Sequence, residues 1–378
     1  MILRYFIATF RAIRSDRPAL LLLVVSTLLY SFFYPSAYSG EVATRMPVAV
    51  VDLDNSAASR SLALKAGAVQ QAEVVAHLRS MPEARALMQD GSIDAIVLIP
   101  AGFADEVHRG GQGSVALYGN GAYLLRSSTA LGGVAAALGA VGVEAATDQA
   151  RMLGAPAAQP LTVISRPLFN TREGYGSSVV PGVVFVIVHQ TLLMGLAMLA
   201  ATLREKEGWV HVSPPGLLGI ALAFFVLGAA QVAYFTGFVF WFQDYPRAGA
   251  DIFALSVAGA LFVSATVAGA LALSSFFRSR ERPLQIWILT SLPIYFLSGL
   301  SWPIEATPAP LVWLGKMLPT TPGINAMIGL NQMGASIGDI WPELANLLAL
   351  TVVYGLIAVF RYGRSSNRFR TAIHLSPV

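Results

Sequence analysis

Residues 179–203 read VVPGVVFVIVHQTLLMGLAMLAATL, and residues 204–208, which follow directly, read REKEG. The first stretch contains no Asp, Glu, Lys or Arg over 25 positions. About 20 apolar residues in a helix suffice to cross the roughly 30 Å hydrocarbon core of a bilayer. The sequence therefore predicts a transmembrane helix that ends abruptly in a charged segment.

Five further stretches are also apolar and free of charged side chains. Together the six predicted spans are 19–38, 179–203, 217–242, 252–277, 284–302 and 345–360. Over all 378 residues the charged fraction is 12% and the hydrophobic fraction 55%, whereas soluble globular proteins carry roughly 25% charged residues. This composition excludes an intrinsically disordered chain. The absence of Cys excludes disulfides and thiolate metal sites.

The basic residues predict the orientation of the spans. The segments 1–18, 203–216, 278–283 and 361–378 together hold thirteen Lys and Arg, whereas 243–251 and 303–344 hold only Arg247 and Lys316. Loops rich in Lys and Arg stay in the cytoplasm. We therefore expect both termini in the cytoplasm, and the net charge of +4 reflects topology rather than nucleic-acid binding.

Residues 1–17 are predicted to form a helix that lies in the cytoplasmic membrane interface. Apolar residues recur there at helical spacing, beside Arg4, Arg11 and Arg14, a pattern typical of interfacial helices. The apolar positions are Leu3, Phe6, Ile7, Phe10 and Ile13. The alternative is a secretory signal peptide cleaved near residues 36–39, but the apolar run is long for that and Tyr38 fits a small-residue cleavage site poorly.

The segment 39–175, between the first two spans, is predicted to be an α/β domain outside the cytoplasm. The stretches 47–53 and 94–99 are β-branched and apolar, as in buried strands. Helices are expected at 56–68, 82–90 and 122–153, and further strands at 115–118 and 161–164. The Asp52-x-Asp54-Asn55-Ser56 run could suggest calcium, but it lacks the later Gly and Glu of a complete loop, so we interpret it as a strand end and helix cap.

The segment 303–342 is apolar, but no continuous spanning helix fits, because it is broken at Pro303, Pro308, Pro310, Pro319 and Pro322. Non-helical backbone at membrane depth is tolerated where protein buries it or a wet cavity lies beside it. We therefore predict a re-entrant element of two short helices before the last span.

Several kinds of chemistry are missing from the sequence. A phosphate-binding loop needs Lys followed by Ser or Thr, and none of Lys65, Lys206 and Lys316 is so placed. The five histidines are not paired at metal-ligand spacing, and no hydrolase motif is present. We therefore expect no catalytic residues, no metal site and no bound cofactor in this chain.

Four groups of residues, in this order, resemble the type 2 ABC transporter permeases with a large extracytoplasmic domain after the first span. They are MPVAVVDLDNS (46–56) with Ser59-Arg60; AIVLIP (95–100) with Phe103; QTLL (190–193) leading to REKEG (204–208); and Ser298-Gly299, WPI (302–304), Pro308 and LP (318–319). The resemblance covers nearly the whole chain. Trp209-Val210 departs from the family pattern, in which a small or hydroxyl residue and Glu-x-Leu are expected.

The resemblance implies a bacterial inner-membrane permease subunit of an ABC exporter. Its partners would be a separate ATPase that binds ATP and Mg, a second permease copy (identical or related) and a periplasmic membrane-fusion adaptor. In domain terms, 1–17 is the interfacial helix, 18–38 the first span, 39–175 the extracytoplasmic domain, 176–362 the permease core and 363–378 a cytoplasmic tail. Residues expected to couple to the ATPase are Arg204, Glu205, Lys206, Glu207, Gly208 and Trp209; Ser298, Gly299, Pro303 and Pro319 would form an outer gate.

The composition of the predicted spans also bears on the kind of substrate. The predicted spans contain almost no fixed charge, which favours a hydrophobic or amphipathic cargo. His189 is the one ionisable residue deep in a span, where such groups often mark a functional cavity. With Gln190 it could line one, although a hydrogen bond between helices is the favoured explanation. The alternatives are a membrane-anchored scaffold without ATP coupling and an ion-driven secondary transporter.

Overall fold

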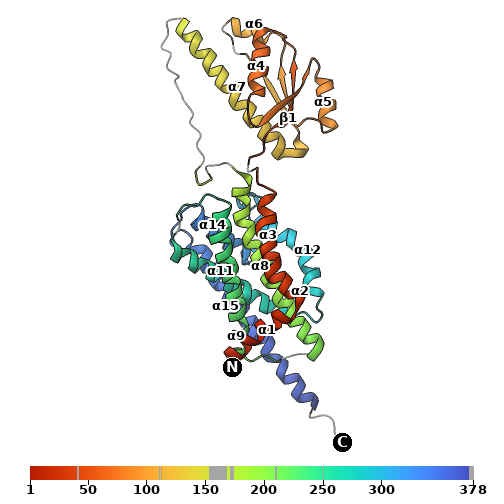
Figure 1. Cartoon of the computed structure of the whole chain (residues 1–378), viewed down its shortest axis with the longest axis vertical. Coiled ribbons are helices and arrows are strands. Elements are labelled where there is room, and N and C mark those ends of the chain that lie inside the picture. Colours follow the sequence, from red (N-terminus) through yellow and green to blue (C-terminus); the bar gives the residue numbers. More distant parts are fainter. Residues whose placement is uncertain are drawn as a thin grey trace. The chain divides into compact units, whose positions relative to one another are not determined.

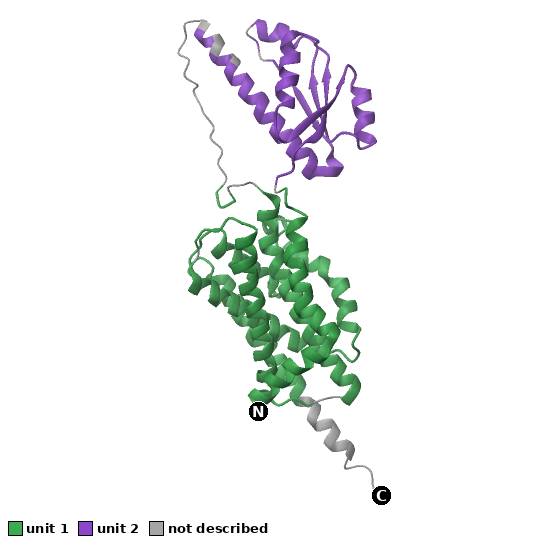
Figure 2. Ribbon diagram, viewed as in Figure 1, with its two compact units in different colours: residues 1–41, 166–378 green, residues 42–165 purple. Residues whose placement is uncertain are grey.

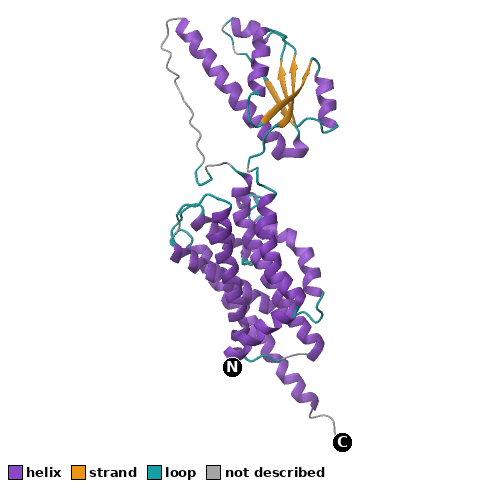
Figure 3. Cartoon of the chain, viewed as in Figure 1, coloured by secondary structure: helices purple, strands orange, loops and turns teal. Residues whose placement is uncertain are grey.

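The computed structural model describes the chain except for residues 41, 110, 112, 153–167, 171–173, 209–210, 250 and 374–378. The chain divides into two compact units (Figure 2). Unit 1 comprises Met1–Glu41 and Arg166–Val378, and unit 2 comprises Val42–Ser165. In the described residues unit 1 is helical, and the strands all belong to unit 2 (Figure 3).

Unit 2 contains a four-stranded sheet in the order β2-β1-β3-β4. The strands are β1 (Met46–Asp52), β2 (Ala72–Leu78), β3 (Ala95–Ile99) and β4 (Ala116–Gly119). Strand β1 runs parallel to β2 and β3, and β4 pairs antiparallel with β3. The predictions for 47–53, 94–99 and 115–118 as strands are thus confirmed, and β2 is a strand that the sequence analysis missed.

Helices cover both faces of this sheet, which explains why β1 and β3 are apolar without alternation. On one face α4 (Ala57–Gly67) and α7 (Leu124–Met152) pack against Val48, Val50 and Val97. On the other face α5 (Met81–Gln89) packs against Ala49, Val51 and Ile96. The three helices lie where they were predicted, and α6 (Phe103–His108) is the helix that the resemblance at 95–103 implies after β3. The predicted strand 161–164 lies outside the described residues.

The acidic turn after β1 is a structural cap. Asp52 Oδ1 accepts hydrogen bonds from the backbone N–H groups of Asp54 (3.0 Å) and Asn55 (2.9 Å), and its Oδ2 accepts from the Ser59 hydroxyl (2.7 Å). Ser56 and Ser59 form a capping box at the start of α4, satisfying two otherwise orphan helix donors. The helix-cap interpretation is confirmed, and no group of residues in the described part of the chain could hold a metal ion.

Unit 1 consists of helices joined by short connections (Figure 1). In chain order they are α1 (Ile2–Ser15), α2 (Arg17–Leu20), the π-helix η1 (Leu21–Val25), α3 (Ser26–Ser36), α8 (Tyr175–Glu207), α9 (Pro214–Ala233), the π-helix η3 (Tyr234–Val239), α10 (Phe240–Phe242), α11 (Ile252–Ser274), α12 (Arg282–Leu297), the 3-10 helix η4 (Ile304–Ala306), α13 (Ala309–Lys316), α14 (Thr320–Asn331) and α15 (Trp341–Ile373).

Within the described residues, six helical segments are long and apolar enough to cross a membrane. Five of them, Arg17–Ser36, Tyr175–Glu207, Pro214–Phe242, Ile252–Ser274 and Trp341–Gly363, coincide with predicted spans. The sixth is Gly121–Glu144, at the start of α7. The number of candidate spans in the described residues therefore agrees with the sequence prediction, but one of the six segments is a different one.

The difference concerns the predicted span 284–302. There α12 has 16 residues, or about 24 Å of helix, which is shorter than a typical hydrocarbon core. The helix ends because Gly299 takes a left-handed conformation (φ +81°), and Pro303 follows soon after. Conversely, α7 has the apolar composition of a span for another reason. One of its faces, which includes Ala130 and Val134, is buried against the sheet.

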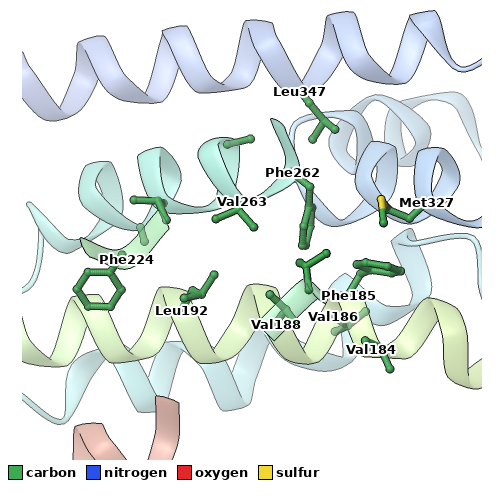
Figure 4. Packing of buried hydrophobic residues seen from close by; sticks show 14 of the residues in the cluster. Val184, Phe185, Val186, Val188, Leu192, Phe224, Phe262, Val263, Met327 and Leu347 are labelled. Atoms are coloured by element: carbon green, nitrogen blue, oxygen red, sulfur yellow. The ribbon is translucent and has the colours of Figure 1, made fainter. Parts of the chain in front are cut away.

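The core of unit 1 lies between α8, α11, α14 and α15 (Figure 4). Phe185 of α8 meets Phe262 of α11 edge-on, with ring centroids 5.7 Å apart. Gly323 lets α14 approach, since a Cβ there would collide with the Phe262 ring. Small residues at such crossings allow close helix packing without a hydrophobic driving force.

A buried polar contact joins the first span to α9. The side-chain amide of Gln231 donates to the Leu23 carbonyl (2.7 Å) and to the Thr27 hydroxyl (2.9 Å). Leu23 lies in the π-helix η1, and its carbonyl also accepts from the Thr27 hydroxyl (3.2 Å). Gln231 contacts both residues and so fixes α9 to the first span.

Candidate coupling site at the end of α8

Arg204 anchors the end of α8 inside unit 1. The residue is 8% exposed, and its Nη1 donates to the Ser274 carbonyl and to the Phe277 carbonyl (2.8 Å). Those carbonyls lie at the C-terminus of α11, which carries the negative end of the helix dipole. The guanidinium also stacks over the Tyr362 ring, 5.1 Å from its centroid. Arg204 therefore positions the charged segment from within the protomer.

Two neighbours reinforce this anchor. Tyr362 of α15 exchanges a hydrogen bond with the Ser274 hydroxyl (2.9 Å). Arg361 Nη2 donates to the Ser275 carbonyl (3.3 Å) and its guanidinium stacks over Phe276 at 4.3 Å. Two arginines thus satisfy the last carbonyls of α11, so α8, α11 and α15 meet at one point.

Glu205 belongs to a second polar cluster, which we call the Asp16–Arg280 latch. Arg280 lies between α11 and α12; its Nη2 is 2.6 Å from Asp16 Oδ1, and its Nη1 donates to the Thr202 hydroxyl (3.2 Å). The Arg280 backbone N–H donates to Glu205 Oε1 (2.9 Å). Asp16 also caps α2 by accepting from the Ala19 N–H (3.0 Å). The latch joins the α1–α2 junction to the end of α8.

The latch is ionised at neutral pH. Burial raises the pKa of Asp16, but the hydrogen bonds from Arg280 and Ala19, with the Arg280 charge, outweigh it and hold the pKa below the ordinary value. A carboxyl with a lowered pKa adds stability above its unfolded pKa and loses it as the pH falls through the folded value. The Asp16–Arg280 contact therefore persists through the physiological range.

Glu205, Lys206 and Glu207 are all exposed, but among these described residues only Glu205 is tied to the latch by a hydrogen bond. Glu205 and Glu207 lie in the last turn of α8, where carboxylates are disfavoured by the helix dipole by about 0.3–1 kcal/mol each. Helix stability therefore does not explain these two acids. Gly208 ends the helix with a φ of +75°, a region that favours glycine. Trp209 lies outside the described residues.

Helix α1 packs against the start of α9. Helix α9 is the next helix along the chain after the charged segment 204–208. Gly216 and Gly219 make room for it: a Cβ at Gly216 would lie 3.0 Å from the Tyr5 ring, and one at Gly219 would collide with the Ile2 carbonyl. Thr9 and Ile13 are buried in this contact. Leu3 and Ile7 are exposed, as expected for a helix whose apolar residues face lipid. Ile13 was predicted to face lipid with them, but it packs in the core of unit 1.

The predicted gate residues lie along the connection from α12 to α14. Ser298 and Gly299 end α12, Pro303 precedes η4, and Pro319 precedes α14. The Thr321 hydroxyl donates to the Leu297 carbonyl (3.0 Å), which ties α14 to the end of α12. Two short helices, α13 and α14, occupy the region predicted to be re-entrant.

His189 is packed between helices. It is 2% exposed; its Nδ1 lies 3.2 Å from the Thr266 hydroxyl, and its ring is 6.3 Å from that of Trp287. These contacts join α8, α11 and α12, and they match the alternative of a hydrogen bond between helices. His189 and Gln190 do not line the four best-defined cavities of the described residues.

The sequence analysis missed Asp16, Arg280, Arg361 and Tyr362. Arg280 and Arg361 were counted only among the basic residues on the predicted cytoplasmic side, and Asp16 and Tyr362 were not singled out. Their partners lie on segments distant in sequence, 264 positions apart for Asp16 and Arg280, so no local spacing reveals the pairing. The one usable signal was Asp16 before Pro18, a typical helix start.

Unit 1 is thus a bundle typical of a polytopic α-helical membrane protein, carrying an inserted α/β unit. Residues 18–360 match the family model described as ABC-2 family transporter protein, and the chain belongs to that family. The inner membrane transport permease YhhJ of Escherichia coli (strain K12) and that of Shigella flexneri are each 27% identical to the chain over 114 residues. That stretch covers 30% of this chain and 30% of each relative.

Proposed function

We propose that this chain is the transmembrane permease subunit of an ABC exporter in a bacterial inner membrane. It moves a hydrophobic or amphipathic substrate outward, and a separate ATPase, which binds ATP and Mg, supplies the energy. The observation that carries the proposal is the end of α8, where exposed Glu207 and Lys206 extend from a helix that buried Arg204 locks into the bundle.

The geometry supports a mechanical role for this end of α8. A partner that pulls on Glu207 moves α8 and, through Arg204, the ends of α11 and α15. Through Glu205 and Arg280 it also moves Asp16 and the N-terminal helices. ATP binding to the partner would then favour one of two global states of the permease, because that state binds the ATP-loaded ATPase more tightly.

The remaining assignments follow from the same proposal. The membrane-crossing helices of unit 1 form half of a transport pathway, so two permease copies assemble, identical or related. Both termini face the cytoplasm, α1 lies at its membrane interface, and unit 2 lies in the periplasm, where it meets a membrane-fusion adaptor. The segment 303–342 dips into the outer leaflet, and Ser298, Gly299, Pro303 and Pro319 form its outer gate.

A scaffold without ATP coupling and an ion-driven transporter are the competing functions. Ion coupling requires ionisable groups at membrane depth, and the five spans common to sequence and structure are free of Asp, Glu, Lys and Arg except at their ends. The exposed acids at the end of α8 favour ATP coupling over a scaffold, since they cost helix stability without a partner.

Glu207→Ala is expected to reduce the stimulation of the partner's ATP hydrolysis by the permease several-fold. Glu207 is exposed and, unlike Glu205, does not accept a hydrogen bond from the Arg280 backbone. The assay measures ATP hydrolysis by the purified ATPase with and without the full chain in lipid nanodiscs.

Glu305→Ala is the matched control, since Glu305 is an exposed acid in η4 on the opposite predicted side. It should leave stimulation unchanged. Full stimulation by the Glu207 variant would reject the proposed contact.

A further inference from the structure

A cavity of about 700 Å³ lies between α9, η3, α11 and the end of α14. Its volume is within the range of sites that bind small molecules, about 300–1,000 Å³. The wall is mainly apolar and includes Phe225, Val232, Leu255 and Met327. It lies near the start of α11, whereas Arg204 binds the far end of that helix, so this cavity is separate from the coupling site.

Polar residues also line the cavity. They are Arg247, Asn331, Thr236 and Ser256. Arg247 is exposed and forms no ion pair with any described residue. The carboxylates nearest in sequence are Asp244, which is engaged elsewhere, and Asp251, whose Oδ1 caps α11 by accepting from the Phe253 N–H (3.0 Å).

Asn331 is the second independent sign of a ligand. The residue is 6% exposed, and its backbone carbonyl accepts from the Ala248 N–H (3.0 Å). Its side-chain amide makes no hydrogen bond to the described part of the chain, and the residue lines the cavity. An amide donor and a guanidinium at the mouth of an apolar cavity suit an anionic headgroup with an apolar tail.

We propose that this cavity binds one acyl chain of an anionic phospholipid of the surrounding bilayer, with the phosphate at Arg247 and Asn331. The cavity volume admits a tail but leaves the headgroup at the mouth, where the loop 243–251 would place it at the membrane surface. Long basic side chains reach headgroups from such positions. The site does not depend on ATP coupling, so it can be tested apart from transport.

The test is native mass spectrometry of the full-length chain purified in detergent with equal amounts of phosphatidylglycerol and phosphatidylcholine. The wild type should retain phosphatidylglycerol at least several-fold over phosphatidylcholine. Arg247→Gln should abolish that preference, because the phosphate loses its charged partner. Ala260→Phe, which fills the cavity, should reduce retention of both lipids.

Lys316→Gln is the matched control, since Lys316 lies on the same predicted side, stacks over Trp313 at 5.0 Å and does not line this cavity. It should keep the preference. An unchanged preference in the Arg247 variant would overturn the proposal, as would a wild-type chain that retains neither lipid, the result expected if a second copy fills the cavity. Sodium oleate added in a parallel sample should not displace phosphatidylglycerol; displacement would assign the site to free fatty acid instead.

Discussion

Arg204→Ala should destabilise the permease strongly, with the free energy of unfolding falling by about 3 kcal/mol. The substitution removes the side-chain donor of the Phe277 carbonyl and one of the two donors of the Ser274 carbonyl, and a buried unsatisfied group costs about 1–3 kcal/mol. The substitution also removes the cation–π contact between the Arg204 guanidinium and the Tyr362 ring. In a thermal unfolding experiment in detergent, a loss of this size lowers Tm by roughly 6–12 °C.

Two further variants isolate the cause. Arg204→Lys should restore part of the stability, because lysine keeps the charge but lacks the planar guanidinium that stacks over the Tyr362 ring. Lys206→Ala, two positions along the same helix and exposed, should leave Tm within about 1 °C, since surface substitutions rarely exceed 0.5 kcal/mol. An Arg204→Ala protein as stable as the Lys206 variant would refute the anchoring role.

Gly219→Val should detach α1 from α9 and abolish stimulation of the partner ATPase. A side chain at this position collides with the Ile2 backbone carbonyl, and its nearest side-chain neighbour, the Tyr5 Cβ, lies 2.9 Å away. Backbone atoms cannot move aside as a flexible side chain can, so α1 itself must shift. Under the proposed function α1 moves with the end of α8 through Asp16, Arg280 and Glu205, which makes the expected functional loss nearly complete.

The absence of native Cys gives this prediction a direct readout. Thr9→Cys introduces a thiol at a buried position of the contact, which a membrane-permeant maleimide should label slowly in the parent and rapidly with Gly219→Val. Gly355→Val is the matched control, because a Cβ at Gly355 meets no atom within 4 Å. Equal labelling in the Gly219 and Gly355 variants would contradict the packing of α1.

Hydropathy alone predicted five of the six membrane-crossing candidates, because about 20 uncharged residues in a row leave few alternatives to a spanning helix. It failed for 284–302, where Gly299 ends α12 early. It also gave no warning that α7, apolar enough to span, packs against a sheet. The mean hydropathy of a segment does not show whether lipid or another part of the protein covers its apolar face.

The α/β unit illustrates a second limit. Strands β1 and β3 were predicted because they are buried on both faces and therefore uniformly apolar. Strand β2 was missed because it lies at the sheet edge and mixes Glu73 and His77 with its apolar residues. Local composition shows a central parallel strand more clearly than an edge strand.

The charged segment was identified from its position at the end of a span, but its internal contacts were not. Sequence position treats Arg204, Glu205 and Glu207 alike. The structure separates them, because Arg204 binds α11, Glu205 binds the Arg280 backbone and Glu207 is exposed. Such differences depend on contacts over 70 or more positions, which no local pattern encodes.

The most direct test of the proposed function is the subunit composition of the intact protein. The full-length chain, tagged at its N-terminus and purified from its native membrane in mild detergent, should bring with it a phosphate-loop ATPase in equimolar amount, and the complex should hydrolyse ATP. A chain that purifies without any ATPase, yet accumulates a hydrophobic dye against its gradient in ATP-depleted vesicles, would contradict the account.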